Sequence, residues 1–275
     1  MAGTLYLVPT PIGNLGDLSR RAAETLAAVD FLAVEDTRVT VKLLNHLELR
    51  KPMVIYHRHN CAQTGPAIVA RLLAGENCAL VTDAGTPAIS DPGEDLVALC
   101  AAEGVPVVAV PGPCALVTAL SVSGLPTGRF TFEGFLPQNK KNRRAQLTAL
   151  QGEERTMIFY EAPHKLRDTL TDLEAAFGPG RRISLCRELT KLHEEVLRTT
   201  LGEAAALYRE REPRGEFVLV VEGAVPEVVK ADPETALARV EELRAGGLSL
   251  KEAAAQAAAE FGLKKRQLYD AALGK

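Results

Sequence analysis

The stretch CALVTDAGTPAISDPGEDLVALC, residues 78–100, contains the pattern that decides the fold. It opens with a short apolar run, which is typical of a strand buried on both faces, and it closes with residues spaced as in a helix. Between them lies a loop rich in Gly and Pro, with Asp83 and Asp91 near its two ends. The stretch therefore predicts a parallel strand, a rigid loop at its carboxyl end and a helix.

The same arrangement recurs through the first half of the chain. Other apolar, β-rich runs lie at residues 5–9, 31–35, 53–57 and 105–111. Helical patterns lie between the runs, at residues 19–29, 39–47, 67–74 and 94–104. Alternation of this kind predicts a mainly parallel α/β sheet, which we assign to a first domain of residues 1–125.

A second alternation of strand and helix patterns follows a Gly- and Pro-rich segment at residues 121–129. Strand patterns lie at residues 130–137, 156–163, 181–189, 196–200 and 215–223. Helical patterns lie at residues 144–151, 164–178 and 201–212. We therefore predict a second α/β domain of residues 126–225.

The last segment, residues 226–275, has a different character. A polar, Pro-marked linker leads into helical patterns only, which resemble a helix-turn-helix. Ser249 and Glu252 have the spacing of a capping box, and Gly262 is placed to end a helix in a left-handed turn. We predict a small helical module that contacts RNA or a second copy of the chain.

The composition narrows the class of protein. The formal net charge of -3 argues against a protein that coats nucleic acid, although a local basic patch remains compatible with it. The five cysteines are scattered without a CxxC pair, which indicates reduced core cysteines. No apolar run is long enough to span a membrane, and the N-terminus lacks the pattern of a secretory signal. We expect a cytoplasmic protein without a membrane partner.

Two more loops share the composition of the loop at residues 83–93. They are LVPTPIGNLGDLS at residues 7–19 and PGPCA at residues 111–115, and each follows a predicted strand. Each loop alone fits a stiff turn as well as a binding site. Three such loops at strand ends of one domain favour the walls of one pocket.

Two common kinds of site are excluded or disfavoured by spacing. Neither the dinucleotide fingerprint GxGxxG nor the phosphate-binding GxxxxGK[ST] is present. His57 and His59 alternate along a predicted strand, so we expect them on opposite faces, and no third ligand is near them. We expect no metal.

The chain resembles the tetrapyrrole-methylase family of S-adenosylmethionine-dependent methyltransferases. Within that family it is most similar to the branch that methylates a cytidine ribose in small-subunit ribosomal RNA. The resemblance is carried, in family order, by YLVPTPIGNLGDLSRRA, AVEDTR, VTDAGTPAISDPG, VPGPCALVTALSVSGLP, FEGFLP, FYEAPHKL and CRELTKLHEE. Relatives that act on corrin or porphyrin rings carry Gly-Asp-Pro where this chain has Gly85-Thr86-Pro87, which favours the RNA branch.

The resemblance implies two α/β domains of tetrapyrrole-methylase type, with S-adenosylmethionine in the cleft between them. It implies 2'-O-methylation of cytidine 1402 in 16S ribosomal RNA, near the decoding centre of the small subunit, by a homodimer that binds no DNA. The donor-binding residues implied by motif position are Pro11, Asp83, Ala84, Gly85, Pro87, Ile89, Cys114, Ala115, Tyr160, Glu161, Leu189 and Thr190. Asp91, just before Pro92 and Gly93, is expected to cap the following helix.

Transfer to a ribose hydroxyl needs a group that accepts its proton, and the residues leave the choice open. The candidates are the carboxylates and imidazoles of the pocket motifs: Glu35, Asp36, His57, His59 and Glu161. Glu35 and Asp36 also fit a purely structural pairing with Arg38.

Basic side chains supply candidate phosphate contacts. They are Arg38, Lys140, Lys141, Arg143, Arg144, Arg187, Lys191, Lys264, Lys265 and Arg266. A solvated helix start or internal ion pairs would explain the same residues.

Two other functions stay open. A methyltransferase acting on a sirohaem or cobalamin precursor is disfavoured by the basic segment 138–147 and the helical tail. A regulator that binds nucleic acid through that tail is disfavoured by the three bare loops.

Overall fold

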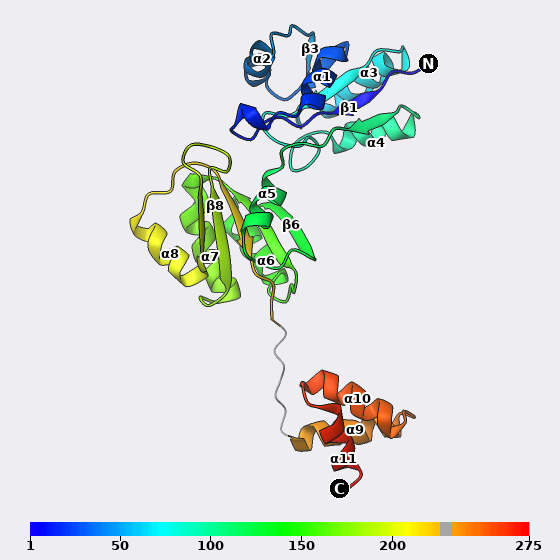
Figure 1. The fold of residues 1–275 in the computed structure, drawn as a ribbon, viewed down its shortest axis with the longest axis vertical. Helices are drawn as coiled ribbons and strands as arrows, with labels where there is room; N and C mark the ends of the chain where they lie inside the picture. The colour runs from blue at the N-terminus through cyan, green and yellow to red at the C-terminus, as the bar shows by residue number, and fades with distance from the viewer. Residues whose placement is uncertain (226–232, 275) are drawn as a thin grey trace. The chain divides into compact units, whose positions relative to one another are not determined.

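The computed structural model describes residues 1–225 and 233–274 of the chain. Contacts between residues divide the chain into two compact units, Met1–Ala224 and Val225–Lys275. The first unit contains two five-stranded sheets, and the second contains three helices (Figure 1). The predicted architecture of two α/β sheets followed by a helical module is confirmed.

The first sheet is wholly parallel, with strand order β3-β2-β4-β1-β5. Its strands are β1 (Leu5–Leu7), β2 (Phe31–Val34), β3 (Met53–Ile55), β4 (Cys78–Val81) and β5 (Val107–Ala109). Its helices are η1 (Leu15–Asp17), α1 (Arg20–Ala28), α2 (Thr37–His46), α3 (Cys61–Leu73) and α4 (Glu94–Ala102). The fully buried strand β4 lies at the centre, so the loop that follows it opens at the middle of the carboxyl edge.

Helices cover both faces of this sheet. One core contains Ile68 of α3 and Leu96 of α4, and the opposite core contains Leu26 of α1 and Leu43 of α2. Burial on both faces explains why the strands read as continuous apolar runs without polar alternation.

The second sheet is mixed, with order β6-β7-β10-β8-β9. β6 (Phe130–Phe135) runs parallel to β7 (Thr156–Glu161), and the remaining neighbours, β8 (Arg182–Arg187), β9 (Glu195–Thr200) and β10 (Phe217–Val221), pair antiparallel. One face carries α6 (Lys140–Ala149), η2 (Pro163–Lys165), α7 (Leu166–Phe177) and α8 (Leu201–Glu210).

Helix α5 (Ala115–Val122) covers the other face of the second sheet. Its residues Leu116 and Leu120 pack with Ile158 of β7 and Val220 of β10. The last helix of the first alternation therefore supports the second sheet. The boundary between residues 125 and 126 stays a prediction.

The segment after β3 differs from the predicted strand at residues 53–57. β3 ends at Ile55, and His57 and His59 lie in a turn with their ring centroids 5.8 Å apart. Asn60 forms this turn, because its side-chain amide donates to the Ile55 carbonyl at 2.9 Å while its amide oxygen accepts from the His57 N–H at 2.8 Å. The expectation that the two histidines alternate along a strand is therefore wrong.

The C-terminal unit contains α9 (Pro233–Ala245), α10 (Leu250–Phe261) and α11 (Lys265–Ala272) around a small core with Val240, Ala254 and Leu268. Ser249 and Glu252 form the predicted capping box, and Gly262 ends α10 at φ 62° in the left-handed region. Most of the predicted linker, residues 226–232, lies outside the described residues. Within residues 1–225 and 233–274, no helix has the length and apolar character to cross a membrane.

Candidate active site

Hydrogen bonds join the three Gly- and Pro-rich loops of the first sheet to one another. Thr10 and Gly85 exchange backbone hydrogen bonds of 2.9 and 3.0 Å, which tie the first loop to the loop after β4. The Thr86 hydroxyl donates to the Pro113 carbonyl at 2.8 Å, which ties the loop after β4 to the loop after β5. The three loops therefore form one connected wall.

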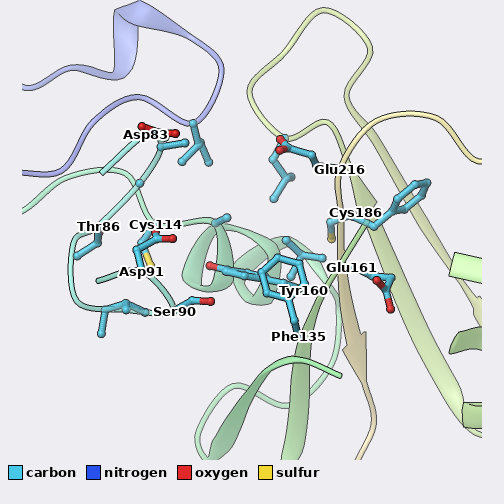
Figure 2. Close-up of a pocket in the computed structure, with 18 of the residues that line it drawn as sticks. Asp83, Thr86, Ser90, Asp91, Cys114, Phe135, Tyr160, Glu161, Cys186 and Glu216 are labelled. Carbon is cyan, nitrogen blue, oxygen red and sulfur yellow. The ribbon is translucent and has the colours of Figure 1, made fainter. Parts of the chain in front are cut away.

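The wall borders a cavity of about 390 Å³, within the usual range for a small-molecule site. Figure 2 shows Asp83, Thr86 and Asp91 on one side of the cavity. Tyr160 and Glu216, from the part of the chain that forms the second sheet, lie on the opposite side. Predicted donor-binding residues that line the cavity are Asp83, Ala84, Gly85, Ile89, Cys114, Ala115, Tyr160, Glu161 and Leu189.

Three predicted donor-binding residues do not line this cavity. Pro11 lines a second cavity of about 230 Å³ instead, and its neighbour Ile12 lines the first cavity. Pro87 is buried within its loop. Thr190 lies between the lining residues Leu189 and Lys191 without lining the cavity itself.

Unusual backbone conformations gather in the loops beside the cavity. Five non-glycine residues of the described chain have positive φ, and four of them are Ala88, Ser90, Glu188 and Thr190, with φ of 64°, 70°, 52° and 67°. Such conformations cost free energy and persist only where surrounding contacts hold them, which is common at binding sites. The segment after β4, with Ala88 and Ser90, and the segment after β8, with Glu188 and Thr190, are thus held in a set geometry beside the cavity.

Three carboxylates give the cavity an acidic edge: Glu35, Asp83 and Asp91. Burial and the charge of Asp83 raise the pKa of Glu35, and burial and the charge of Asp36 raise the pKa of Asp83. Burial and the charge of Glu35 raise the pKa of Asp91 to about 6. The charge of Arg58 opposes the upward pKa shifts of Glu35 and Asp91, but burial and the mutual repulsion of the carboxylates outweigh it. This edge is therefore complementary to a cationic ligand.

Asp91 does not cap the following helix, so that prediction is wrong. The residue at the cap position of α4 is Gly93, at φ 144°, and no side chain caps the helix. A Cβ on Gly93 would lie 2.6 Å from Leu80 Cδ2, so another residue at this position would have to displace that side chain as well as adopt a conformation that favours glycine. This close turn leaves Asp91 on the cavity wall.

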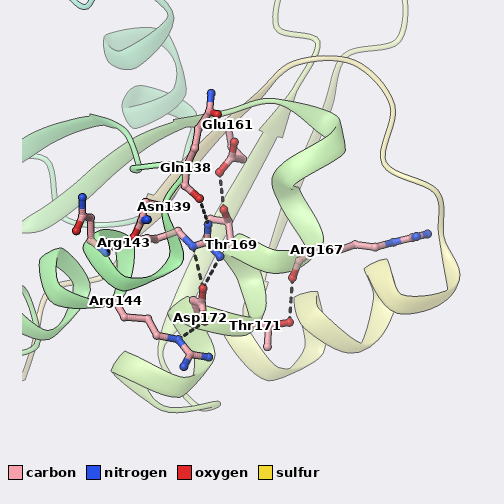
Figure 3. A network of polar contacts seen from close by, with 10 residues as sticks. Gln138, Asn139, Arg143, Arg144, Glu161, Arg167, Thr169, Thr171 and Asp172 are labelled. Carbon is pink, nitrogen blue, oxygen red and sulfur yellow. Dashed lines mark hydrogen bonds and ion pairs between the residues drawn. The ribbon is translucent and has the colours of Figure 1, made fainter.

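The other candidate proton acceptors are differently engaged. Asp36 caps α2 and binds Arg38 at 2.5 Å, and these hydrogen bonds lower the pKa of Asp36 to about 2. The Glu161 carboxylate accepts from the Thr169 hydroxyl at 2.5 Å and from the Ala162 N–H at 2.8 Å (Figure 3). His57 does not line the cavity.

Tyr160 links the second sheet to the start of α5. Its hydroxyl accepts a hydrogen bond from the Leu116 N–H at 3.1 Å, which satisfies one of the free donors of that helix end. Burial raises the pKa of Tyr160, so the hydroxyl stays protonated. Its ring lies edge-on to Phe132 and Phe135, with centroids 4.9 and 5.6 Å away.

The basic segment at the start of α6 divides into two sets of residues. Arg143 is buried and binds Asp172 of α7 at 2.7 Å, and Arg144 binds the same carboxylate at 3.0 Å (Figure 3). Arg143 lies on the face of α6 that packs on α7, so it cannot contact RNA as predicted. Lys140 and Lys141 are exposed.

Three other predicted phosphate contacts form ion pairs within the chain. Arg38 binds Asp36, Arg187 binds Glu195 at 3.0 Å, and Lys191 binds Glu188 and Glu216, each at 2.8 Å. Lys264, Lys265 and Arg266 are exposed at the start of α11.

Several lining residues have no counterpart among the predicted ones. They are Ile12, Thr86, Ser90, Asp91, Phe135, Ala162, Cys186, Glu188, Phe217 and Val218, together with Glu216. The glycine within the run FEGF signals an irregular strand next to Phe135, but the residues of β8 and β10 give no such signal. In the described part of the chain, no group of three His, Cys, Asp or Glu side chains could hold a metal ion.

A parallel sheet, a mixed sheet and an acidic cavity walled by three bare loops define a two-sheet α/β protein with a small-molecule site and without the Rossmann glycine fingerprint. The chain belongs to the family described as Tetrapyrrole (Corrin/Porphyrin) Methylases, whose model matches residues 4–205. A model described as the RsmI C-terminal HTH domain matches residues 230–275.

Curated relatives match almost the whole chain. A protein of Synechocystis is 50% identical over 272 residues, covering 98% of both chains, and one of Escherichia coli O157:H7 is 49% identical over 275 residues, covering 98% of this chain and 95% of the relative. Both are named Ribosomal RNA small subunit methyltransferase I. The predicted family and methyltransferase class are confirmed.

A solved structure confirms the fold. Uroporphyrin-III C-methyl transferase from Thermus thermophilus, complexed with S-adenyl homocysteine, superposes with a TM-score of 0.57 at 19% identity, covering 80% of this chain and 97% of that chain.

Proposed function

We propose that the chain transfers the methyl group of S-adenosylmethionine to the 2'-hydroxyl of a cytidine ribose, cytidine 1402, in the 16S RNA of the small ribosomal subunit. The observation that carries the proposal is the acidic cavity walled by three joined loops, in a chain about half identical to named ribosomal RNA methyltransferases. Because ribosomal subunits are cytoplasmic, the proposal places the protein in the cytoplasm.

The cavity fits the donor in charge and in shape. S-adenosylmethionine supplies an electrophilic methyl group on a positively charged sulfonium. The carboxylates of Glu35, Asp83 and Asp91 stabilise a cation at the cavity edge. Ala84 and Gly85 expose backbone on one side, and the small residues Cys114 and Ala115 open the start of α5 on another.

Thr190 supplies a further polar group beside this wall. Its hydroxyl oxygen is buried and has no hydrogen-bond partner in the described chain. A buried polar atom without a partner is costly, and a bound molecule that reaches it would remove that cost. We assign this hydroxyl to the donor, next to Leu189.

Asp91 is the group we assign as proton acceptor. Its pKa of about 6 makes it a stronger base than an ordinary carboxylate, and it is still ionised at neutral pH. Burial, and next the negative charge of Glu35, raise that pKa, so Glu35 acts through Asp91. The fixed loops hold the reacting groups in line, which lowers the barrier by reducing the entropy lost on alignment.

The exposed lysines at the start of α6, Lys140 and Lys141, are assigned to the RNA phosphates, as are Lys264, Lys265 and Arg266 of the C-terminal unit. A homodimer is part of the proposal, and light scattering on the purified protein measures it.

The proposal is tested with S-adenosylmethionine labelled in its methyl group. The protein is incubated with small subunits from cells that lack the enzyme, with uroporphyrinogen III, and with DNA. Label in the subunit RNA supports the proposal, whereas label only in uroporphyrinogen supports a tetrapyrrole methyltransferase. Retention of DNA without any transfer supports a nucleic-acid-binding regulator.

A further inference from the structure

Strand β6 contains a β-bulge at Glu133, two residues before its last residue, Phe135. Phe132 pairs with Ile158 of β7, and the next pair joins Gly134 to Phe159, so Glu133 is an extra residue without a partner. Gly134 has φ 63°, in the left-handed region that favours glycine. Bulges of this kind bend a strand and redirect the side chains that follow.

The bulge turns Phe135 towards the cavity. In an unbroken strand, side chains three positions apart point to opposite faces, so Phe132 and Phe135 would be separated by the sheet. With Glu133 inserted, both rings contact the same neighbour, Tyr160, at interplanar angles of 66° and 67°. Figure 2 shows the Phe135 ring next to Tyr160.

Phe135 lies at the rim of the cavity and is only partly covered. It lines the cavity, yet 56% of its surface is exposed. Exposure alone does not distinguish Phe135 as a binding residue, because Phe130 on the same strand is 40% exposed and does not line the cavity. The distinguishing feature of Phe135 is that a backbone irregularity holds an exposed ring at the entrance, braced by a second aromatic ring.

We propose that Phe135 is the platform on which the nucleobase of the target nucleotide stacks. The inference rests on the proposed function and names a substrate-binding residue for it. Aromatic rings hold unpaired RNA bases by stacking, at about 1–3 kcal/mol per base.

The position of the ring favours a base of the RNA over the adenine of the donor. The RNA approaches from outside and meets the exposed rim first, whereas the assigned donor residues Gly85, Ala115 and Leu189 lie on the cavity wall. Lys140 and Lys141 follow Phe135 by five and six residues, which span at most about 20 Å of chain. A stacked base would therefore place neighbouring phosphates within reach of these lysines.

The test compares Phe135→Ala, Phe135→Leu, Phe135→Tyr and Phe135→Trp, with Phe130→Ala as the matched control on the same strand. Two quantities are measured for each: KM for small subunits that lack the methyl group, and Kd for S-adenosylhomocysteine by calorimetry. We expect the Ala and Leu variants to raise KM by about 5- to 150-fold, the equivalent of the stacking free energy. The Tyr and Trp variants and Phe130→Ala should stay near the wild type, and Kd should not change.

Three results would overturn the inference. They are a wild-type KM in Phe135→Ala, a Leu variant as good as the Trp variant, or a loss of S-adenosylhomocysteine affinity equal to the loss in KM. The failure of the proposed function is distinct, because the wild type itself would then methylate no subunit RNA.

Tryptophan fluorescence distinguishes stacking of the target nucleobase at position 135 from stacking of the donor's adenine. The chain contains no Trp, so Phe135→Trp introduces a single indole emitter. We expect S-adenosylhomocysteine alone to change its emission no more than it changes that of Phe130→Trp. Strong quenching of the indole at position 135 alone would assign the ring to the donor's adenine and contradict the inference.

Discussion

The Thr86 hydroxyl donates a hydrogen bond to the Pro113 carbonyl oxygen across 2.8 Å, and this contact joins loops that follow two different strands. The backbone pairing of Thr10 with Gly85 joins the third loop to them. Proline carbonyls and glycine backbone groups are available for such pairing, because these loops have few bulky side chains. The composition that makes the loops look bare also allows them to form one wall.

Thr86→Val should weaken donor binding without unfolding the protein. The change keeps the shape of the side chain and removes one hydrogen bond, which is worth about 0.5–1.5 kcal/mol, so Kd for S-adenosylmethionine should rise about 2- to 12-fold. Calorimetry measures this. Thr86→Ser keeps the hydroxyl and should bind normally, and an unchanged Kd in the Val variant would show that the wall does not depend on this contact.

Asp91→Asn should abolish most methyl transfer but weaken donor binding only modestly, because Glu35 and Asp83 remain at the cavity edge. The pKa of Asp91 is raised to about 6, so the carboxylate is the active form and the rate of the wild type should fall as the pH drops through about 6. The Asn variant should lack this titration. Asp168→Asn, at an exposed carboxylate of α7, is the charge control. An Asp91→Asn variant with the wild-type rate and pH profile would exclude Asp91 as the proton acceptor.

The same substitution should stabilise the fold at neutral pH. Because the folded-state pKa of Asp91 lies above the ordinary value of 3.8, the folded protein binds more protons than the unfolded chain between the two values. The free energy of unfolding therefore loses a contribution as the pH rises from about 4 to about 6. Asp91→Asn should raise the Tm at about pH 7.5 and give no gain near pH 4. A lower Tm at neutral pH would contradict this.

Substitutions of neighbouring basic residues of α6 should have two different effects, one on stability and one on RNA binding. Arg143→Ala leaves the buried Asp172 carboxylate without its main partner and should cost about 3–5 kcal/mol in the free energy of unfolding. Lys140→Ala with Lys141→Ala should keep the Tm, weaken RNA binding and lower the salt dependence of log K by about 1.5. Denaturant titrations and RNA binding at several salt concentrations measure both. A stable Arg143→Ala that binds RNA poorly would reverse the assignment.

Much of the fold and one wall of the site were predictable, because both follow from local patterns. Buried strands give apolar runs, and the loops at their ends carry Gly and Pro, so a pocket walled by three loops was predictable. The resemblance to the family then supplied the lining positions Asp83, Gly85 and Ala115. The second wall comes from the mixed sheet, whose lining residues Cys186 of β8 and Val218 of β10 are ordinary buried side chains. Nothing in the local pattern distinguishes these from core residues.

The incorrect predictions for Asp91, Arg143 and His57 have a common physical cause. Each depends on the detailed course of the backbone and its contacts, which a local sequence pattern does not show. The cap role of Asp91 failed because Gly93, with φ 144°, takes the cap position of α4. The basic segment at the start of α6 gave no sign that Arg143 faces α7 while Lys141 faces solvent, because that depends on the packing of two helices. The strand at His57 ended early because Asn60 closes a turn through its own side chain.

The most direct test of the account is the identity of the methylated nucleoside. Small subunits from cells that lack the enzyme are methylated by the purified protein with labelled donor, and the RNA is digested completely to nucleosides for chromatography and mass spectrometry. The account predicts that the label is in 2'-O-methylcytidine and that Asp91→Asn gives little of it. Label in a base-methylated nucleoside, or in RNA other than that of the small subunit, would contradict it.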